Sequence, residues 1–380
     1  MGLAKEAAPS DKIKCSKKIK NEVIMPRIII NGKEAEVPGG LTILEAARTM
    51  KIPIPTLCHH PKLTPYGGCR LCIVEVKGSS RPMAACTTPV SEGMEVITST
   101  PAIEELRKTI LELILSDHPQ ECLVCEGAGS CQLQELAYAY NLKEIRFTGE
   151  RRLYDSKDGN PFIERDLEKC VLCGRCVKIC DEVQGVKAID FAKRGFYAKI
   201  STAFERDLDC EFCGQCVSVC PTGALTGKQW RAKGRQKDIT TVNTTCPYCG
   251  TGCTLTLHVK DNEIVRVTSP QKAPNEGLLC VKGRFGYTFV SSPDRLKRPL
   301  IRTAPKDTVA EDPFTLFREA SWQEALDLVA SRLRDIKTEC GPDAIGGLSS
   351  ARCTTEENYL FQKLIRAAIG TNNVDHCARL

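Results

Sequence analysis

The sequence contains no long apolar run. A membrane-spanning helix needs about 18 or more consecutive apolar residues, and no segment of this chain reaches that length. The first 25 residues, MGLAKEAAPSDKIKCSKKIKNEVIM, also lack both the apolar segment of a secretory signal peptide and a twin-arginine signal. These absences argue against a membrane span and predict a cytoplasmic protein whose cysteines stay reduced.

Nucleotide-binding and nucleic-acid-binding motifs are missing as well. No G-x-G-x-x-G follows a predicted strand, and no G-x-x-x-x-G-K-[ST] occurs. Nicotinamide chemistry is therefore expected to need a partner subunit. The formal net charge is +6, but only 6% of the residues are aromatic, and no basic-aromatic recognition pattern accompanies the lysines and arginines. Nucleic-acid binding is not expected.

Cysteine is the residue that the chain has in excess, with 23 among 380 residues. The segments CVLCGRCVKIC and CEFCGQCVSVCP repeat the C-x2-C-x2-C-x3-C spacing of bacterial ferredoxins, in which the fourth cysteine of each motif completes the other cluster. The two motifs consist of Cys170, Cys173, Cys176 and Cys180, and of Cys210, Cys213, Cys216 and Cys220. We therefore expect Cys220 to complete the first [4Fe-4S] cluster and Cys180 to complete the second. A pair of zinc sites is the alternative.

An upstream group of cysteines predicts a [2Fe-2S] cluster in a β-grasp ferredoxin fold. Its members are Cys58, Cys69, Cys72 and Cys86. RIIINGKEAEV reads as two strands about an Asn31-Gly32 turn, and a helix that begins after Thr42 has Glu45 in place for a capping box. His59 and His60 are expected to be loop residues, because a Rieske centre needs two histidines in place of two cysteines and four cysteines are already present.

A third kind of cysteine group contains a histidine. Its members are His118, Cys122, Cys125 and Cys131. It follows an amphipathic segment that places Ile103, Leu106, Ile110 and Ile114 on one helix face. We expect His118 to be the fourth ligand of a [4Fe-4S] cluster, since a neutral imidazole in place of a thiolate lowers the negative charge and raises the potential. Ligation by three cysteines with a vacant iron is the alternative.

The last group of cysteines predicts a fifth cluster. Its members are Cys246, Cys249, Cys253 and Cys280. The segment TLTLHVKDNEIVRV between the third and the fourth cysteine is expected to form a strand pair with its turn at Asp261-Asn262. All groups together predict one [2Fe-2S] and four [4Fe-4S] clusters.

These motifs resemble those of known redox proteins. Residues 27–240 resemble the iron–sulfur segment shared by the large peripheral subunit of respiratory complex I and by NAD-linked hydrogenases. Residues 241–380 resemble the start of a formate dehydrogenase catalytic subunit. The whole chain is similar to the N-terminal part of an NAD-linked or electron-bifurcating formate dehydrogenase alpha subunit, which is a molybdopterin oxidoreductase. The resemblance implies a molybdenum or tungsten bis-molybdopterin guanine dinucleotide, with Lys282 as an electron relay that contacts this cofactor.

The resemblance also implies partners and a function. The expected partners are an FMN-containing, NADH-binding flavoprotein subunit, ferredoxin-like subunits and a hydrogenase. The expected function is electron transfer between a bis-pterin site for formate and carbon dioxide and such a partner. One alternative is a self-contained multi-cluster electron-transfer subunit of a hydrogenase, bifurcating or complex I-like assembly. A different bis-pterin enzyme, such as a nitrate reductase, is another.

The segment GTNNVDHCARL bears on catalysis. It resembles the segment that, in selenium-dependent formate dehydrogenases, precedes the metal-ligating selenocysteine or cysteine and then a catalytic histidine. No catalytic residue is therefore expected within this chain, and the ligating residue is expected at the position after Leu380. Because selenocysteine is encoded by UGA, which standard translation reads as stop, the resemblance predicts a UGA codon there.

The fold class expected is α+β with several domains. The predicted parts are a disordered basic tail (1–26), a [2Fe-2S] ferredoxin-like domain (27–100), a His-Cys [4Fe-4S] unit (101–150), a double [4Fe-4S] ferredoxin-like domain (151–235), the [4Fe-4S] domain of bis-pterin oxidoreductases (241–300) and an incomplete α/β domain (301–380). In the last part, Ser321 and Glu324 predict a capping box, followed by a helix, a strand and another helix.

Overall fold

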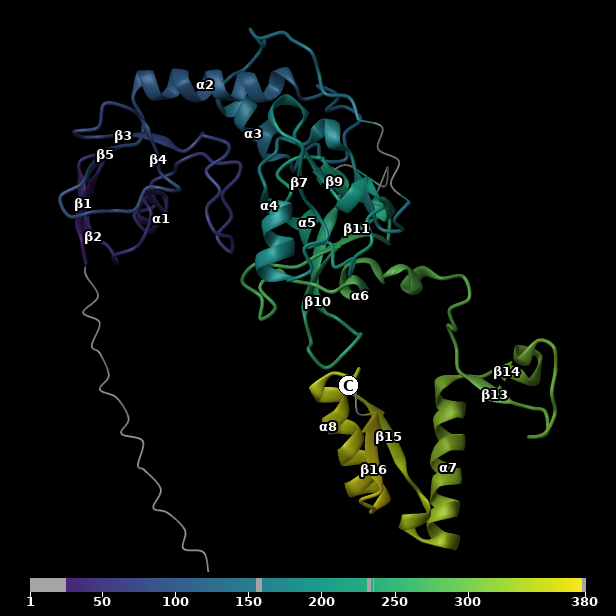
Figure 1. The fold of residues 1–380 in the computed structure, drawn as a ribbon. Helices are drawn as coiled ribbons and strands as arrows, with labels where there is room; N and C mark the ends of the chain where they lie inside the picture. Colours follow the sequence, from purple (N-terminus) through teal and green to yellow (C-terminus); the bar gives the residue numbers. More distant parts are fainter. Residues whose placement is uncertain (1–24, 155–158, 231–233, 235, 378–380) are drawn as a thin grey trace, which may run out of the picture. The chain divides into compact units, whose positions relative to one another are not determined.

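The computed structural model of the protein describes residues 25–154, 159–230, 234 and 236–377 (Figure 1). Its chain divides into two compact units, Met1–Thr56 with Arg70–Arg107, and Leu57–Cys69 with Lys108–Leu380. The predicted disordered tail lies outside the described residues except for Met25 and Pro26. Among the described residues, no helix combines the length and the apolar character that crossing a membrane requires.

The first unit is built on a five-stranded sheet. Its strands, in the order β2-β1-β5-β3-β4, are Lys33–Glu36, Arg27–Ile30, Glu95–Ile97, Ile73–Val76 and Met83–Ala84. β1 pairs antiparallel with β2 and parallel with β5. The predicted hairpin at Asn31-Gly32 is confirmed, because both turn residues have the positive φ that a tight hairpin needs. The helix α1 (Ile43–Thr49) is confirmed too, with Thr42 as its N-cap in a capping box.

The helix α2 (Pro101–Ser116) exists as predicted, but one member of its predicted apolar face is exposed. Ile103 and Leu111 are fully buried and Arg107 between them is 3% exposed, whereas Leu106 is 44% exposed. Leu106 is therefore exposed although it lies on the predicted apolar face. The reason is that the guanidinium of Arg107 hydrogen-bonds buried backbone carbonyls, so a charged side chain occupies a position that hydrophobic periodicity would give to an apolar one.

The second unit begins with the cysteine-rich part of the chain. Its elements there are α3 (Gln132–Ala139), the two-stranded sheets β6 (Ile163–Arg165) with β9 (Leu225–Gly227) and β7 (Asp190–Ala192) with β8 (Lys199–Ser201), the helices α4 (Arg175–Lys178) and α5 (Gln215–Val219), and the π-helix η2 (Ile179–Val183). A hydrophobic core joins β6, β8, β9, α4 and α5 and includes Ile163, Ile200, Val217 and Phe285. The short helices α4 and α5 lie side by side (Figure 1).

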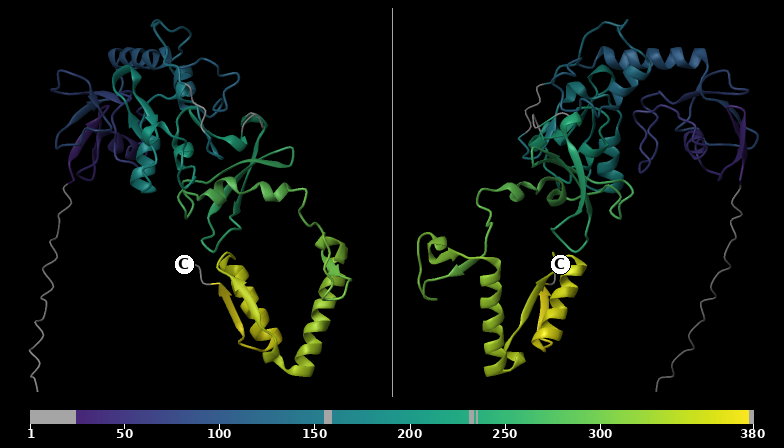
Figure 2. Two further views of the ribbon diagram at one scale, coloured as in Figure 1. Left: turned by 45° about the vertical axis from the view of Figure 1, so that its right-hand side comes forward. Right: turned by 180° about the vertical axis from the view of Figure 1, so that it is seen from behind.

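A three-stranded antiparallel sheet follows. Its strands are β10 (Thr240–Thr245), β11 (Thr254–Lys260) and β12 (Glu263–Thr268), and it is drawn from two sides in Figure 2. The predicted turn is confirmed, since Asp261 and Asn262 have φ of 50° and 63°. β10 was not predicted, because all its residues are exposed and therefore show no apolar alternation. The helix α6 (Val281–Phe285) follows this sheet in the sequence.

The last part of the chain contains the expected helix, strand and helix. Its elements are β13 (Leu300–Arg302) with β14 (Phe317–Glu319), α7 (Trp322–Cys340), β15 (Gly347–Ser350), α8 (Thr355–Lys363), the π-helix η10 (Leu364–Ile369) and β16 (Val374–Cys377). β15 and β16 pair in parallel, and α8 packs on β15 (Figure 1). Half of the predicted capping box is present, since Ser321 accepts from the Glu324 amide. The Glu324 carboxylate pairs with Arg318 instead.

Candidate metal centres

The first ferredoxin motif receives its fourth cysteine from the second motif. Cys170, Cys173 and Cys176 line a cavity together with Cys220, which is the C-cap residue of α5. The other walls of this cavity are mainly apolar and include Ile189, Ile200 and Leu225. The structure therefore brings together four thiols whose sequence positions span two motifs.

The second motif mirrors the first. Cys210, Cys213 and Cys216 line another cavity together with Cys180, which lies in the π-helix η2 at the end of the first motif. The fourth cysteine of each motif thus lies with the first three cysteines of the other motif, which is the arrangement that the spacing predicts for paired cubanes. That these thiols bind iron remains a prediction.

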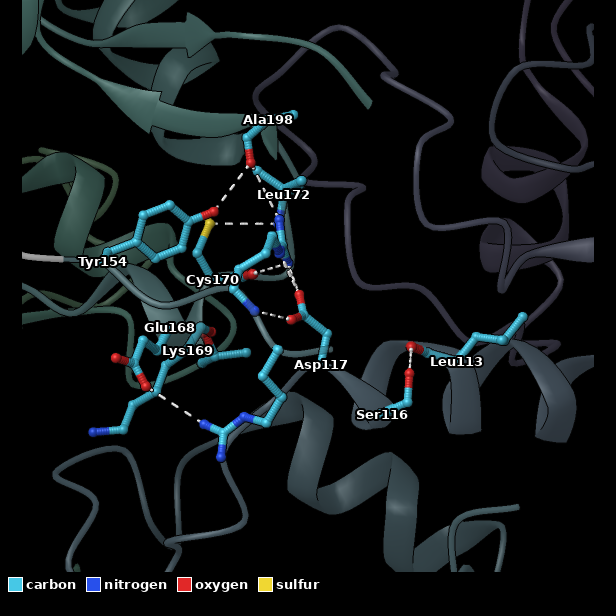
Figure 3. Close-up of polar contacts among 12 residues, drawn as sticks. Leu113, Ser116, Asp117, Tyr154, Glu168, Lys169, Cys170, Leu172 and Ala198 are labelled. Carbon is cyan, nitrogen blue, oxygen red and sulfur yellow. Dashed lines mark hydrogen bonds and ion pairs between the residues drawn. The ribbon is translucent and has the colours of Figure 1, made fainter. Parts of the chain in front are cut away.

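The two loops share one backbone conformation. Leu172 and Phe212 have φ of 51° and 47°, and both motifs then place a left-handed glycine before their short helix. These turns direct backbone amides at sulfur: the Leu172 amide donates to Cys170 Sγ over 3.4 Å (Figure 3), and the Phe212 amide donates to Cys210 Sγ over 3.3 Å. Such donors stabilise thiolate charge and raise the potential of a bound cluster.

Burial disfavours the thiolate form of these cysteines. It raises the pKa of Cys170 to about 11 and that of Cys173 to about 12, and it raises the pKa of Cys176 well above the ordinary value. Neighbouring thiolates, Cys220 among them, add to these increases. Thiolates crowded in an apolar cavity need a compensating positive centre, and metal binding supplies it by displacing the protons. The donor set therefore fits a [4Fe-4S] cluster.

The His-Cys group also converges. His118, Cys122 and Cys131 line a common pocket, and Cys125 lies near enough to act electrostatically on the Cys131 thiol. Nδ1 of His118 is buried and has no hydrogen-bond partner among the described residues. Burial lowers the pKa of His118 to about 4, so its imidazole is neutral at physiological pH, the form that binds a metal.

Replacing His118 by cysteine is expected to lower the potential of one [4Fe-4S] cluster without loss of iron. The added thiolate carries a negative charge that disfavours the reduced state. Redox titration followed by EPR, with iron analysis, measures both quantities. An unchanged set of midpoint potentials would show that His118 is not a ligand.

The four cysteines of the [2Fe-2S] prediction are distributed over both units. Cys72 and Cys86 are buried in the hydrophobic core of the first unit. Cys58 and Cys69 belong to the segment Leu57–Cys69 of the second unit, where the Leu57 amide donates to Cys69 Sγ over 3.4 Å. His59 and His60 lie in the same segment, outside any helix or strand. Ligation by the four thiols remains a prediction.

The fifth group forms around the sheet β10-β11-β12. The Cys246 amide donates to the Cys253 carbonyl over 2.8 Å. Burial raises the pKa of the Cys246 thiol, and Cys253, Cys280 and Cys249 raise it further. Cys280 caps α6, and the half-buried Lys282 follows within that helix. The relay role of Lys282 remains a prediction. In the described part of the chain, no three His, Cys, Asp or Glu side chains meet as ligands of a single metal ion.

Sequence reasoning missed two buried arginines beside these centres. Arg175 is 5% exposed and Arg284 is fully buried. Burial lowers the pKa of Arg284 to about 10, while the thiolates of Cys213, Cys216 and Cys280 oppose this decrease. The sequence held a signal for Arg175 alone: the two motifs read CGRC and CGQC, so one repeat carries a charge where the other has an amide.

Five family models match the chain. They are the 2Fe-2S iron-sulfur cluster binding domain (25–101), the NADH-ubiquinone oxidoreductase-G iron-sulfur binding region (107–146), the NADH-quinone oxidoreductase subunit 3 ferredoxin-like domain (160–226), the molybdopterin oxidoreductase Fe4S4 domain (239–292) and the molybdopterin oxidoreductase domain (295–380). The chain therefore contains ferredoxin-type iron–sulfur domains and molybdopterin oxidoreductase domains, of mixed α/β structure.

Similar proteins include two curated relatives and a solved structure. The NADPH-Fe(3+) oxidoreductase subunit alpha of Geobacter sulfurreducens is 40% identical over 94% of this chain and 40% of its own length. The NADH-quinone oxidoreductase G 2 subunit of Rhizobium meliloti is 40% identical over 93% of this chain and 40% of its own length. A chain from the crystal structure of an NAD+-reducing [NiFe]-hydrogenase in the H2-reduced state is 30% identical, with a TM-score of 0.52, over 55% of this chain and 90% of that one.

The chain spans about 40% of the length of these curated relatives. The matches are consecutive along the chain and run from the [2Fe-2S] domain to the molybdopterin oxidoreductase domain. The chain carries the N-terminal iron–sulfur region of a molybdopterin oxidoreductase family protein that is similar to the G-type subunits of NADH-quinone oxidoreductase.

Proposed function

We propose that this chain is the multi-cluster electron-transfer part of a complex like NADH-quinone oxidoreductase or an NAD-reducing hydrogenase. The observation that carries the proposal is the exchange of Cys180 and Cys220 between two buried cavities. Two cubanes in one small fold lie close together, as a relay of electrons requires. The similarity to a G-type subunit of NADH-quinone oxidoreductase and to a hydrogenase chain supports the same function.

The residues of the chain hold the clusters and set their potentials. When bound, the clusters accept and release single electrons. The cysteine loops supply thiolates and amide donors, and the apolar walls of the cavities exclude water. His118 supplies a neutral ligand, which distinguishes its cluster electrostatically from the all-thiolate ones.

The partner proposed is an FMN-containing flavoprotein subunit that binds NADH, with ferredoxin-like subunits or a hydrogenase as further partners. The sequence of this chain contains no Rossmann fingerprint and no P-loop. A partner must therefore convert the two electrons of a hydride into the single electrons that clusters transfer. Stoichiometric NADH binding by the purified chain alone would contradict this division of labour.

The reconstituted chain is expected to contain one [2Fe-2S] and four [4Fe-4S] clusters, or about 18 irons, by the ligand groups above. Iron and zinc analysis, with EPR of the reduced protein, tests this number. Zinc in stoichiometric amount, or iron below about half of that value, would exclude the proposed function.

Formate dehydrogenase is the second candidate function. The observation that favours it is the pair of molybdopterin oxidoreductase matches at residues 239–292 and 295–380. In this proposal a molybdenum or tungsten bis-molybdopterin guanine dinucleotide would supply the formate chemistry, and Lys282 would act as the electron relay toward it. Formate-dependent dye reduction by the full-length gene product decides between the candidates, since an electron-transfer subunit without formate chemistry gives no such reduction.

A further inference from the structure

Arg284 connects the fifth cysteine group to the second ferredoxin motif. It lies in α6, four residues after Cys280, and is fully buried. Its Nε donates to the Cys213 carbonyl over 2.8 Å, and its Nη2 donates to Gln215 Oε1 over 3.1 Å. Gln215 is 1% exposed and makes a hydrogen bond of its own to the segment of Cys280: its Nε2 donates to the Leu279 carbonyl over 2.9 Å. The two groups are thus joined by three hydrogen bonds.

The local backbone makes room for this side chain. Gly214 has a φ of +67°, and a Cβ at this position would collide with the Arg284 side chain. The next residue of α6, Phe285, stacks on Phe162 with ring centroids 5.2 Å apart and belongs to the ferredoxin core. The short helix is therefore held against the ferredoxin core by an aromatic contact and against the second motif by the guanidinium.

The charge of Arg284 has no carboxylate partner among the described residues. The groups that act on it electrostatically are the thiols of Cys213, Cys216 and Cys280, which belong to two predicted centres. Its Nη1 is buried and has no hydrogen-bond partner in the described part of the chain. A buried guanidinium is costly without a countercharge. The thiolates of these two groups, with the negatively charged clusters that they would hold, would supply that countercharge.

We propose that Arg284 is a positioning residue that ties the Cys280 group to the second ferredoxin motif and raises the reduction potential of the cluster at Cys180, Cys210, Cys213 and Cys216. A fixed positive charge stabilises the reduced cluster, which carries one more negative charge than the oxidised one. Because the charge is buried, solvent screens it weakly. The proposal rests on the proposed function, since it requires these thiols to hold a cluster.

The first motif contains a matching contact. Arg175 occupies the position of Gln215 in the repeat, and its Nη1 donates to Gln132 Oε1 over 3.0 Å. Gln132 directly follows Cys131 of the His-Cys group. Each ferredoxin motif is therefore linked to one neighbouring group by an arginine-glutamine pair. A substitution of one arginine can thus be compared with the same substitution of the other.

The experiment compares Arg284→Gln and Arg284→Lys with Arg298→Gln in the reconstituted full chain. Arg298 is a suitable control, because its side chain is 71% exposed and pairs only loosely with Glu319 at 3.8 Å. Iron content and EPR-monitored midpoint potentials are measured for each variant. Arg284→Gln should lower the potentials of the two [4Fe-4S] clusters whose thiols face Arg284, most strongly that of the second ferredoxin motif, with iron unchanged. Arg284→Lys should keep both potentials near their wild-type values. Arg298→Gln should shift none, and Arg175→Gln should shift a different cluster.

The outcomes separate this proposal from the cluster assignment. Full iron and unchanged potentials in Arg284→Gln would overturn the role of Arg284 and leave the proposed function intact. A wild-type chain without iron would overturn the proposed function, and this proposal with it. If Arg284→Gln fails to hold iron, Arg284→Lys decides: restored iron with a wild-type potential supports the proposal, and no restoration overturns it.

Discussion

Replacing Cys220 by alanine is expected to remove the cluster of the other ferredoxin motif. Cys220 lies in the same cavity as Cys170, Cys173 and Cys176, so about four of the 18 irons should be lost from that site. The cluster of the motif to which Cys220 belongs in sequence should remain, because Cys180 completes it. Iron analysis and EPR of the reduced protein measure the loss and identify the surviving signal.

The reciprocal variant makes this test specific. Cys180→Ala should remove the other [4Fe-4S] signal and spare the one lost in Cys220→Ala. Cys340→Ala serves as the control, because Cys340 is exposed at the end of α7 and belongs to none of the five groups. Loss of the same signal in both variants would contradict the exchange of the fourth ligands.

Replacing Arg107 by alanine is expected to destabilise the first unit by about 3–5 kcal/mol. Its Nε donates to the Leu71 carbonyl over 3.1 Å, and its Nη2 donates to the carbonyls of Ile73 and Thr98 over 2.8 Å. Alanine would leave these buried acceptors unsatisfied, at roughly 1–3 kcal/mol each. Amide hydrogen exchange of β3 and β5 should accelerate by about two to four powers of ten.

A matched surface arginine controls for the loss of charge. Arg48 is exposed in the last turn of α1 in the same unit. Arg48→Ala should leave the exchange of β3 and β5 nearly unchanged. Unaltered protection in Arg107→Ala would mean that the three carbonyls find other partners and that Arg107 does not hold this unit together.

Local sequence signals predicted local structure well. Thr42 and Glu45 predicted the capped start of α1, and Asp261-Asn262 predicted the turn between β11 and β12. Each of these features depends on residues that are at most three positions apart in the sequence. The strand β10 was not predicted, because its exposed residues form no apolar pattern. It is a strand through its antiparallel pairing with β11.

Burial across elements was predicted less well. Hydrophobic periodicity placed Leu106 on the apolar face of α2, yet the buried position on that turn of the helix belongs to Arg107. Periodicity cannot anticipate a charged residue that is buried because backbone carbonyls from other segments of the chain accept its hydrogen bonds. The same limit applies to Arg284, whose acceptors come from a segment far away in sequence.

The sequence by itself determined the cysteine groups, because three ligands of a ferredoxin motif lie within one short loop whose geometry depends on spacing and on Gly174 or Gly214. It also indicated, through the repeat, which fourth cysteine serves which motif. Only the tertiary structure decided what surrounds these groups. The apolar walls, the thiol pKa values and the guanidinium of Arg284 come from segments that meet through packing, and such contacts depend on the whole chain and leave no pattern in any one stretch of it.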